Sequence, residues 1–167
     1  RGRSASNLLV FMPMATPEVV MGSALLTWFV TLTFARGITT ILIAHIMFCL
    51  SFVVVTVKAR IAGLDPRLEQ AAMDLYADER TTFWKVTFPL VLPGIVGASL
   101  LAFSLSFDDF IITNFNNGTT VTFPLYVWGA AQRGIPPQVN VIGSIMFFAA
   151  LAIVVVAQIV GAARRKK

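Results

Sequence analysis

Long apolar runs alternate with shorter polar segments along the whole chain. Crossing about 30 Å of hydrocarbon takes roughly 20 helical residues, and four of the runs are long enough. They lie at about residues 8–34, 39–57, 89–107 (or on to 115) and 139–160. The pattern predicts an all-α protein, a bundle of four membrane-spanning helices, with polar connections at 58–88 and 116–138.

Two prolines, Pro13 and Pro17, interrupt the first of these runs. A proline inside a helix removes a backbone hydrogen bond and kinks or breaks the helix at that point. We therefore expect the first run to be broken or kinked, and not to form one straight helix.

Composition also favours a lipid environment. Of the 167 residues, 57% are hydrophobic and 13% are charged, and the mean hydropathy is +0.81. Soluble domains are nearer to about 45–50% apolar and about 25% charged. The single histidine, His45, and the single cysteine, Cys49, both lie in apolar runs. They offer neither a disulfide framework nor a Cys/His metal cluster, and we interpret both as packing residues.

The ends of the chain carry two further expectations. No cleavable signal peptide is expected, because the first residues lead into a long apolar run without a small-residue cleavage site. The sequence starts at Arg1 and not at a methionine, so we expect a fragment of a longer protein.

The basic residues predict how the chain is oriented. With four spans, both ends and the segment 58–88 lie on one side of the membrane. Of the 13 Lys and Arg residues, all but Arg36 and Arg133 fall on that side. Positive residues are enriched in short cytoplasmic loops, so both ends and 58–88 are expected to be cytoplasmic. Topology thus explains the net charge of +5, and no nucleic-acid partner is expected.

The cytoplasmic segment 58–88 predicts two short helices. Asp65 followed by Pro66 is typical of a helix start, since the aspartate can cap and the proline needs no partner in the first turn. Asp78 can cap a second helix. Such a pair could fill a groove on a cytoplasmic partner or lie on the inner leaflet as an amphipathic element, and the mixed charges leave both open.

The same segment resembles the E-A-A…G…I-x-L-P loop of ABC importer permeases. The similar residues are E-Q-A-A-M-D-L-Y-A and, from Val86 on, V-T-F-P-L-V-L-P-G-I. Gln70 and Tyr76 depart from the family pattern, which has a glutamate and a glycine there. In that family the loop docks into the ATP-binding subunit. The resemblance therefore implies ATPase-coupling roles for Asp65, Glu69, Gln70, Ala71, Ala72, Asp74, Leu75, Tyr76, Phe83 and Trp84.

Three further segments are similar to the spermidine/putrescine branch of these permeases. They read P-E-V-V-M-G, S-F-D-D-F-I-I-T-N-F and F-P-L-Y-V-W-G-A-A-Q-R-G-I-P-P-Q-V-N, so the resemblance covers nearly the whole chain. It implies a type I ABC importer permease domain over residues 1–167, holding the third to sixth of six spans. It also implies a bacterial inner-membrane location and three partners: a second permease in a heterodimer, an ATPase dimer and an extracytoplasmic polyamine-binding protein.

Glu18 is one candidate for a substrate path. It lies about 15 Å into the first run, near mid-bilayer. Carboxylates within spans are costly and often mark transport paths, especially at broken helices. The alternative is local, because Thr16-Pro17-Glu18 is itself a helix start and a helix N-terminus tolerates a negative charge.

Asp108 and Asp109 follow the third run and are the other acidic candidates. They could instead be solvated or cap the next segment. Neighbouring helix positions point about 100° apart, so one aspartate is expected to face the path. The other is expected to bond neighbouring backbone or Ser106, and the sequence leaves open which is which. With Glu18 they would form an acidic track suited to a linear polycation.

Aromatic residues could add cation–π contacts to an amine, and the candidates are Trp28, Tyr126 and Trp128. Such residues more often anchor a protein at the membrane interface. The chain has no G-x-x-x-x-G-K-[ST] motif, so we expect ATP and Mg to bind a partner ATPase and no cofactor or metal to bind this chain.

The function predicted is therefore that of a non-enzymatic permease subunit importing spermidine or putrescine by alternating access. One alternative is an ABC permease for another small solute such as ferric iron. Another, from a different class, is an ATP-independent cation channel in which Asp108 and Asp109 form a charged ring.

Overall fold

The computed structural model describes residues 2–134 and 136–165, and every regular element among them is helical. The all-α prediction is thereby confirmed for this part of the chain. The helices are α1 (Gly2–Ala15), α2 (Glu18–Thr31), α3 (Ile38–Ala62), α4 (Arg67–Asp74), α5 (Glu79–Thr82), the π-helical turn η1 (Phe83–Thr87), α6 (Phe88–Asp108), α7 (Ile111–Asn116), α8 (Phe123–Arg133) and α9 (Pro137–Arg165).

The chain divides into two compact units, Arg1–Pro124 and Leu125–Lys167. The first holds α1 to α7, and the second holds most of α8 and all of α9. Three basic residues that entered the orientation prediction, Arg1, Lys166 and Lys167, lie outside the described residues.

Two helical stretches among the described residues are long and apolar enough to cross a membrane. One is α3, with 25 residues and an 18-residue window of mean hydropathy 2.5. The other is the continuous stretch Glu79–Asp108, with 30 residues and an 18-residue window of mean hydropathy 2.0. The second stretch joins α5, η1 and α6, so Pro89 continues the preceding helix and does not end it. The shorter apolar helices are α2 and the part of α9 at Pro137–Ala152. The four-span arrangement stays a prediction.

The first apolar run is divided between two helices. Pro13 lies within α1, which ends at Ala15, and α2 begins directly after Pro17. Pro17 has an extended ψ of 136°, which turns the chain between the two helices. The hydroxyl of Thr16 donates 2.8 Å to the carbonyl of Met12 and closes the last turn of α1. The break that the prolines predict is therefore at residues 16–17.

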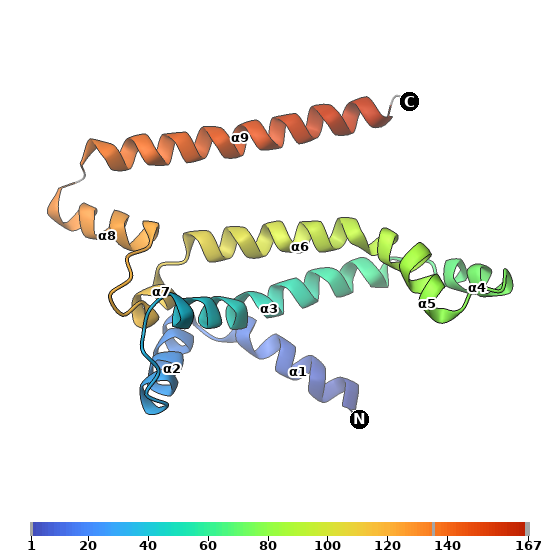
Figure 1. Cartoon of the computed structure of the whole chain (residues 1–167), viewed down its shortest axis with the longest axis horizontal. Coiled ribbons are helices and arrows are strands. Elements are labelled where there is room, and N and C mark those ends of the chain that lie inside the picture. The colour runs from blue at the N-terminus through green and yellow to red at the C-terminus, as the bar shows by residue number, and fades with distance from the viewer. Residues whose placement is uncertain (1, 135, 166–167) are drawn as a thin grey trace. The chain divides into compact units, whose positions relative to one another are not determined.

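In the first unit α3 and α6 run antiparallel and side by side (Figure 1). The loop with α4 and α5 joins them at one end, and α2 and α7 pack at the other. The buried core lies at that second end, where side chains of α2, α3 and α7 meet. It consists of Met21, Leu25, Phe29, Ala44, Phe48, Cys49 and Ile112.

Candidate functional site: a polar cluster at the end of α6 and an exposed loop

Asp109 lies directly after α6 and turns its carboxylate into the protein. Its backbone is extended (φ −61°, ψ 123°), which ends α6 at Asp108. The side chain is 1% exposed. It accepts hydrogen bonds from the backbone N–H groups of Ile112 (3.3 Å) and Thr113 (2.8 Å) and from the Thr113 hydroxyl (2.7 Å). The carboxylate thus caps the first turn of α7, whose N–H groups have no partner within the helix.

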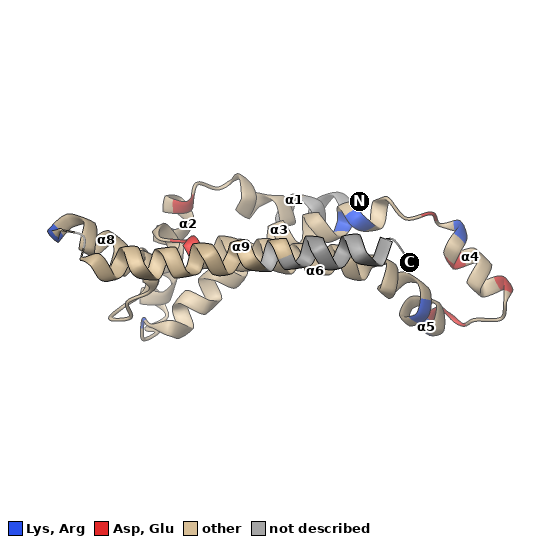
Figure 2. Cartoon of the chain, turned by 90° about the horizontal axis from the view of Figure 1, so that it is seen from above, with Lys and Arg blue, Asp and Glu red and all other residues tan. Residues whose placement is uncertain are grey.

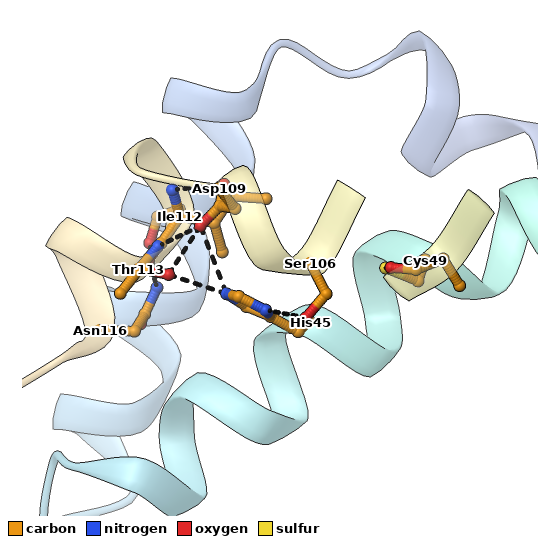
Figure 3. Close-up of polar contacts among 9 residues, drawn as sticks. His45, Cys49, Ser106, Asp109, Ile112, Thr113 and Asn116 are labelled. Atoms are coloured by element: carbon orange, nitrogen blue, oxygen red, sulfur yellow. Dashed lines mark hydrogen bonds and ion pairs between the residues drawn. The ribbon is translucent and has the colours of Figure 1, made fainter. Parts of the chain in front are cut away.

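His45 on α3 connects this cap to α6 (Figure 3). Its Nε2 lies 2.8 Å from Thr113 Oγ1 and 3.3 Å from Asp109 Oδ2, and its Nδ1 lies 2.7 Å from Ser106 Oγ. A polar group at membrane depth is costly unless it is paired. The imidazole meets this requirement with partners on both ring nitrogens.

The hydrogen bonds between His45, Thr113 and Asp109 have one direction. The hydroxyl of Thr113 has a single proton, which it donates to Asp109. Its oxygen must therefore accept from His45, so Nε2 carries a proton. Nδ1 and the Ser106 hydroxyl share the remaining hydrogen bond of the ring. The chain runs from Ser106 through His45 and Thr113 to Asp109, which is its final acceptor.

The two adjacent aspartates have different surroundings. Asp108 is the last residue of α6 and is exposed, whereas Asp109 is buried. Asp109 is the one that bonds neighbouring backbone. Ser106, expected as a partner of one aspartate, contacts His45. That Asp108 faces a substrate path stays a prediction.

Asn116 holds the C-terminal end of α7 against α2 and α3. It is fully buried, and its Nδ2 donates to the carbonyls of Ile112 (2.9 Å) and Gly22 (3.3 Å). Its own backbone carbonyl accepts 2.7 Å from Thr40 of α3. A Cβ on Gly22 would lie 2.8 Å from the Phe115 ring, so α2 and α7 can approach this closely only with glycine there. The short helix α7 is therefore held against both α2 and α3.

The remaining substrate-path candidates lie on α2 and α8. Glu18 is the exposed first residue of α2. Trp28 is 50% exposed on α2 and lines an apolar groove of about 350 Å³ formed by side chains of α1, α2 and α3. Tyr126 and Trp128 are partly exposed on α8, in the second unit. The role of all four in a path stays a prediction.

The sequence interpretation of His45 as a packing residue missed its place in this cluster. The sequence did contain a signal for this role. His45 is an ionisable residue inside a long apolar run, and such a residue needs a polar partner. The partners were not visible, because Ser106 and Thr113 lie 61 and 68 positions further along the chain. Among the described residues, no three His, Cys, Asp or Glu side chains gather as a metal site requires.

The predicted coupling loop, residues 58–88, forms the second candidate site. It contains the last residues of α3, then α4, α5 and η1, and the first residue of α6. Asp65 caps α4 by accepting 2.9 Å from the N–H of Arg67, and Asp78 caps α5 by accepting 3.1 Å from the N–H of Thr81. Both sequence-predicted caps are confirmed. The Thr81 hydroxyl and then its N–H hold the pKa of Asp78 below its usual range. In Figure 2 the charged residues gather over α4 and α5.

Most residues expected to couple to an ATPase are exposed. Helix α4 buries no side chain, and Gln70, Ala71 and Asp74 are among its exposed residues. Ala72 is partly buried. Next to α4, Leu75 is 81% and Tyr76 100% exposed, while Phe83 and Trp84 are about half exposed. Glu69 differs, since its carboxylate accepts a 2.6 Å hydrogen bond from Thr87 of η1.

Tyr76 occupies a backbone conformation that favours glycine. Its φ is 63°, in the left-handed region. The N–H of Tyr76 donates to Met73 (2.9 Å) and that of Ala77 to Ala72 (3.1 Å), which together make a Schellman cap at the end of α4. The residue at this place in such a cap is usually glycine. This accounts physically for the glycine of the family pattern, and the turn forms here with tyrosine.

The family described as binding-protein-dependent transport system inner membrane component matches residues 1–165. The chain is 37% identical over 161 residues to the spermidine/putrescine transport system permease protein PotC of Haemophilus influenzae, covering 96% of this chain and 63% of that protein.

Two Escherichia coli (strain K12) proteins are similarly related. The spermidine/putrescine transport system permease protein PotC is 35% identical over 167 residues, covering 99% of this chain and 63% of that protein. The putrescine transport system permease protein PotI is 35% identical over 153 residues, covering 87% and 54%. The chain therefore spans less than two thirds of the length of these relatives.

Proposed function

Because this chain belongs to the family of binding-protein-dependent transport system inner membrane components, we propose that it is a permease subunit of an ATP-driven polyamine importer. It is a transport subunit and not an enzyme, and its substrate is spermidine or putrescine. The observation that carries the substrate class is the exposed carboxylate of Asp108 at the apolar end of α6. An ammonium group that loses water within a membrane needs such a partner.

Asp108 is better suited to this role than its neighbour. Asp109 already accepts from two backbone N–H groups and one hydroxyl and touches His45. A carboxylate has about four acceptor positions, so little of its capacity is left for a substrate. Asp108 thus takes an ammonium group of the polyamine, with Glu18 as a further carboxylate along the path.

The coupling loop receives the motion of a partner ATPase. Its exposed surface of α4, Leu75 and Tyr76 docks into that subunit. The hydrogen bond from Thr87 to Glu69 fastens α4 to the stretch Glu79–Asp108. At about 1.5 Å per residue that continuous helix is about 45 Å long, and it ends at Asp108. A displacement of α4 therefore reaches the substrate carboxylate along one helix, as alternating access requires.

The complete importer contains other chains. A second permease forms a heterodimer with this one, an ATPase dimer holds ATP and Mg, and an extracytoplasmic binding protein delivers the polyamine. The chain lies in the bacterial inner membrane with both ends of the present sequence and the coupling loop in the cytoplasm. The excess of basic residues on that side supports this orientation.

The test is uptake of labelled spermidine into vesicles carrying the complete complex. Asp108→Asn should raise KM about tenfold or more because a charge partner of the amine is lost, whereas Asp108→Glu, which keeps the charge, should retain most uptake. Unchanged uptake in Asp108→Asn at normal membrane levels would contradict the role of Asp108.

The same assay separates the other functions. If the complex hydrolyses ATP but takes up no spermidine, its substrate is another small solute such as ferric iron. Flux that persists without ATP would identify a cation channel and remove the proposed role of the coupling loop.

A further inference from the structure

We propose that His45 is a positioning residue of the transport path, which holds Asp109 in the cap of α7 and thereby leaves Asp108 as the aspartate that meets the substrate. The inference rests on the proposed function for the role of Asp108. The holding of Asp109 by His45 does not depend on it. His45 touches no substrate in this proposal and acts through Thr113 and Asp109.

Asp109 is buried next to His45. Its side chain is 1% exposed and that of His45 is 11% exposed. A buried carboxylate is stable only when hydrogen bonds and charges compensate its lost hydration, and removing one partner leaves an uncompensated group. Two backbone N–H groups come from the same short segment as Asp109. His45 is the partner that comes from a different long helix.

The hydrogen bonds run from His45 toward Asp109. Ser106 contacts Nδ1 of His45, His45 donates to Thr113, and Thr113 donates to Asp109. Each group satisfies the next, so loss of the Nε2 proton donor leaves the Thr113 oxygen without its donor and Asp109 without a contact. Polar networks of this kind fail together, because their members polarise and orient one another.

The cluster joins three helices of the first unit. Ser106 is in α6, His45 in α3 and Thr113 in α7, and the cluster therefore fixes the end of α6 relative to α3. Asp108 and Asp109 are consecutive, so the backbone that places one carboxylate also places the other. If Asp109 leaves its cap, the end of α6 shifts and Asp108 changes direction.

Glutamine and asparagine at position 45 each replace one of the two ring nitrogens of His45. Glutamine can place its amide near the position of Nε2 and still donate to Thr113, whereas asparagine reaches only the position of Nδ1, beside Ser106. Leucine replaces both. In spermidine uptake by the complete complex, His45→Gln should keep KM within about threefold, and His45→Asn and His45→Leu should raise it about tenfold with a smaller change in the maximal rate.

A double-mutant cycle distinguishes positioning from packing. Asn at position 109 has no charge to compensate, so His45→Leu should raise KM no further in an Asp109→Asn complex. An equal rise in both backgrounds would overturn the proposal, because His45 would then act independently of Asp109. Unchanged KM in His45→Leu alone would overturn it as well.

Thr113 provides a second route if His45 variants fail to assemble. Thr113→Val is close in shape and removes the hydroxyl, whereas Thr113→Ser keeps it. The valine variant should reproduce the rise in KM and the serine variant should not. Equal behaviour of the two would contradict a hydrogen-bonded chain through this hydroxyl.

A measurement without substrate separates this inference from the proposed function. The purified complex is treated with a water-soluble carbodiimide and glycine ethyl ester, and labelling of each aspartate is read by fragment-ion mass spectrometry. Asp108 should be labelled and Asp109 protected in the wild type, and Asp109 should become reactive in His45→Leu but not in His45→Gln. Protection of Asp109 in all variants would overturn the inference, whereas a complex that lacks spermidine uptake yet shows the expected labelling would overturn only the proposed substrate.

Discussion

Gly94 on α6 lies against the side chain of Arg60 on α3. A Cβ placed on Gly94 would stand 2.5 Å from Arg60 Cγ and 2.6 Å from Arg60 Cβ. The guanidinium Nε of Arg60 also donates 3.0 Å to the carbonyl of Leu90. The two helices therefore touch near the coupling loop through a contact that admits no side chain at position 94.

Gly94→Ala should lower stability. The new methyl group meets the base of the Arg60 side chain, which cannot move aside freely, and overpacking of this kind costs about 1–3 kcal/mol. Helix propensity offsets up to about 1 kcal/mol of that cost. Gly97→Ala is the matched control, since nothing lies within 4 Å of its added Cβ. Thermal unfolding of the purified complex in detergent should show a lower Tm for Gly94→Ala only, and equal Tm values for both variants would contradict the contact.

Removing the Thr87 hydroxyl should loosen the coupling loop. Thr87→Val deletes the donor of the 2.6 Å hydrogen bond to Glu69. Both residues lie outside the core, so the expected cost is small, about 1 kcal/mol. We expect faster hydrogen–deuterium exchange in residues 67–75 and a lower transport rate per ATP hydrolysed. Thr87→Ser keeps the hydroxyl and should behave as the wild type. Identical exchange in the valine and serine variants would show that this bond does not fasten α4.

Tyr76→Gly should stabilise the turn after α4. A left-handed conformation costs a non-glycine residue about 1 kcal/mol or more, and glycine adopts it freely. Part of this gain is lost because glycine makes the unfolded chain more flexible. The N–H groups of residues 76 and 77 close the cap. Their hydrogen–deuterium exchange, corrected for intrinsic rates, should be slower in the variant than in the wild type.

Tyr76→Gly also tests whether the exposed Tyr76 ring takes part in docking to the ATPase. Tyr76→Gly should weaken retention of the ATPase during purification, although the turn itself is more stable. Tyr76→Phe keeps the ring and should retain the ATPase. If glycine and phenylalanine variants retain it equally, the Tyr76 ring does not contribute to docking.

Acid should weaken the start of α5 through Asp78. The pKa of this carboxyl is lowered because Thr81 donates to its ionised form through its hydroxyl and its N–H. A group whose pKa is depressed by folding stabilises the fold above its unfolded pKa, about 3.9, and that contribution disappears as the pH falls through the folded value. Exchange of residues 79–82, corrected for the intrinsic pH dependence, should therefore lose protection below about pH 4.

Asp78→Asn is the control for this pH dependence. Asparagine also caps helices but does not titrate, so its protection should not change over the same pH range. A variant that loses protection in parallel with the wild type would show that another group is responsible.

Local features of this chain could be predicted from the sequence because their causes are local. Asp65 and Asp78 cap the helices that follow them, and each accepts from a residue two or three positions away. The break before α2 follows directly from Pro17. The sequence predicted that one of Asp108 and Asp109 bonds neighbouring backbone or Ser106 and that the other faces the path. Which of them bonds the backbone depended on where α6 ends.

Apolar runs, prolines and caps by themselves determined the long apolar helices, the break before α2 and the two capped helices between α3 and α6, since each arises from interactions within a few residues. The separate helix α7 was not predicted. Only the tertiary structure decided that Asp109 is buried, that His45 lies 3.3 Å from it, and that Gly94 must be small. These outcomes depend on contacts such as those of His45 with Ser106 and Thr113, 61 and 68 positions away. Hydropathy and spacing do not specify which faces of distant helices meet, because the same apolar surface can face a neighbouring helix or lipid.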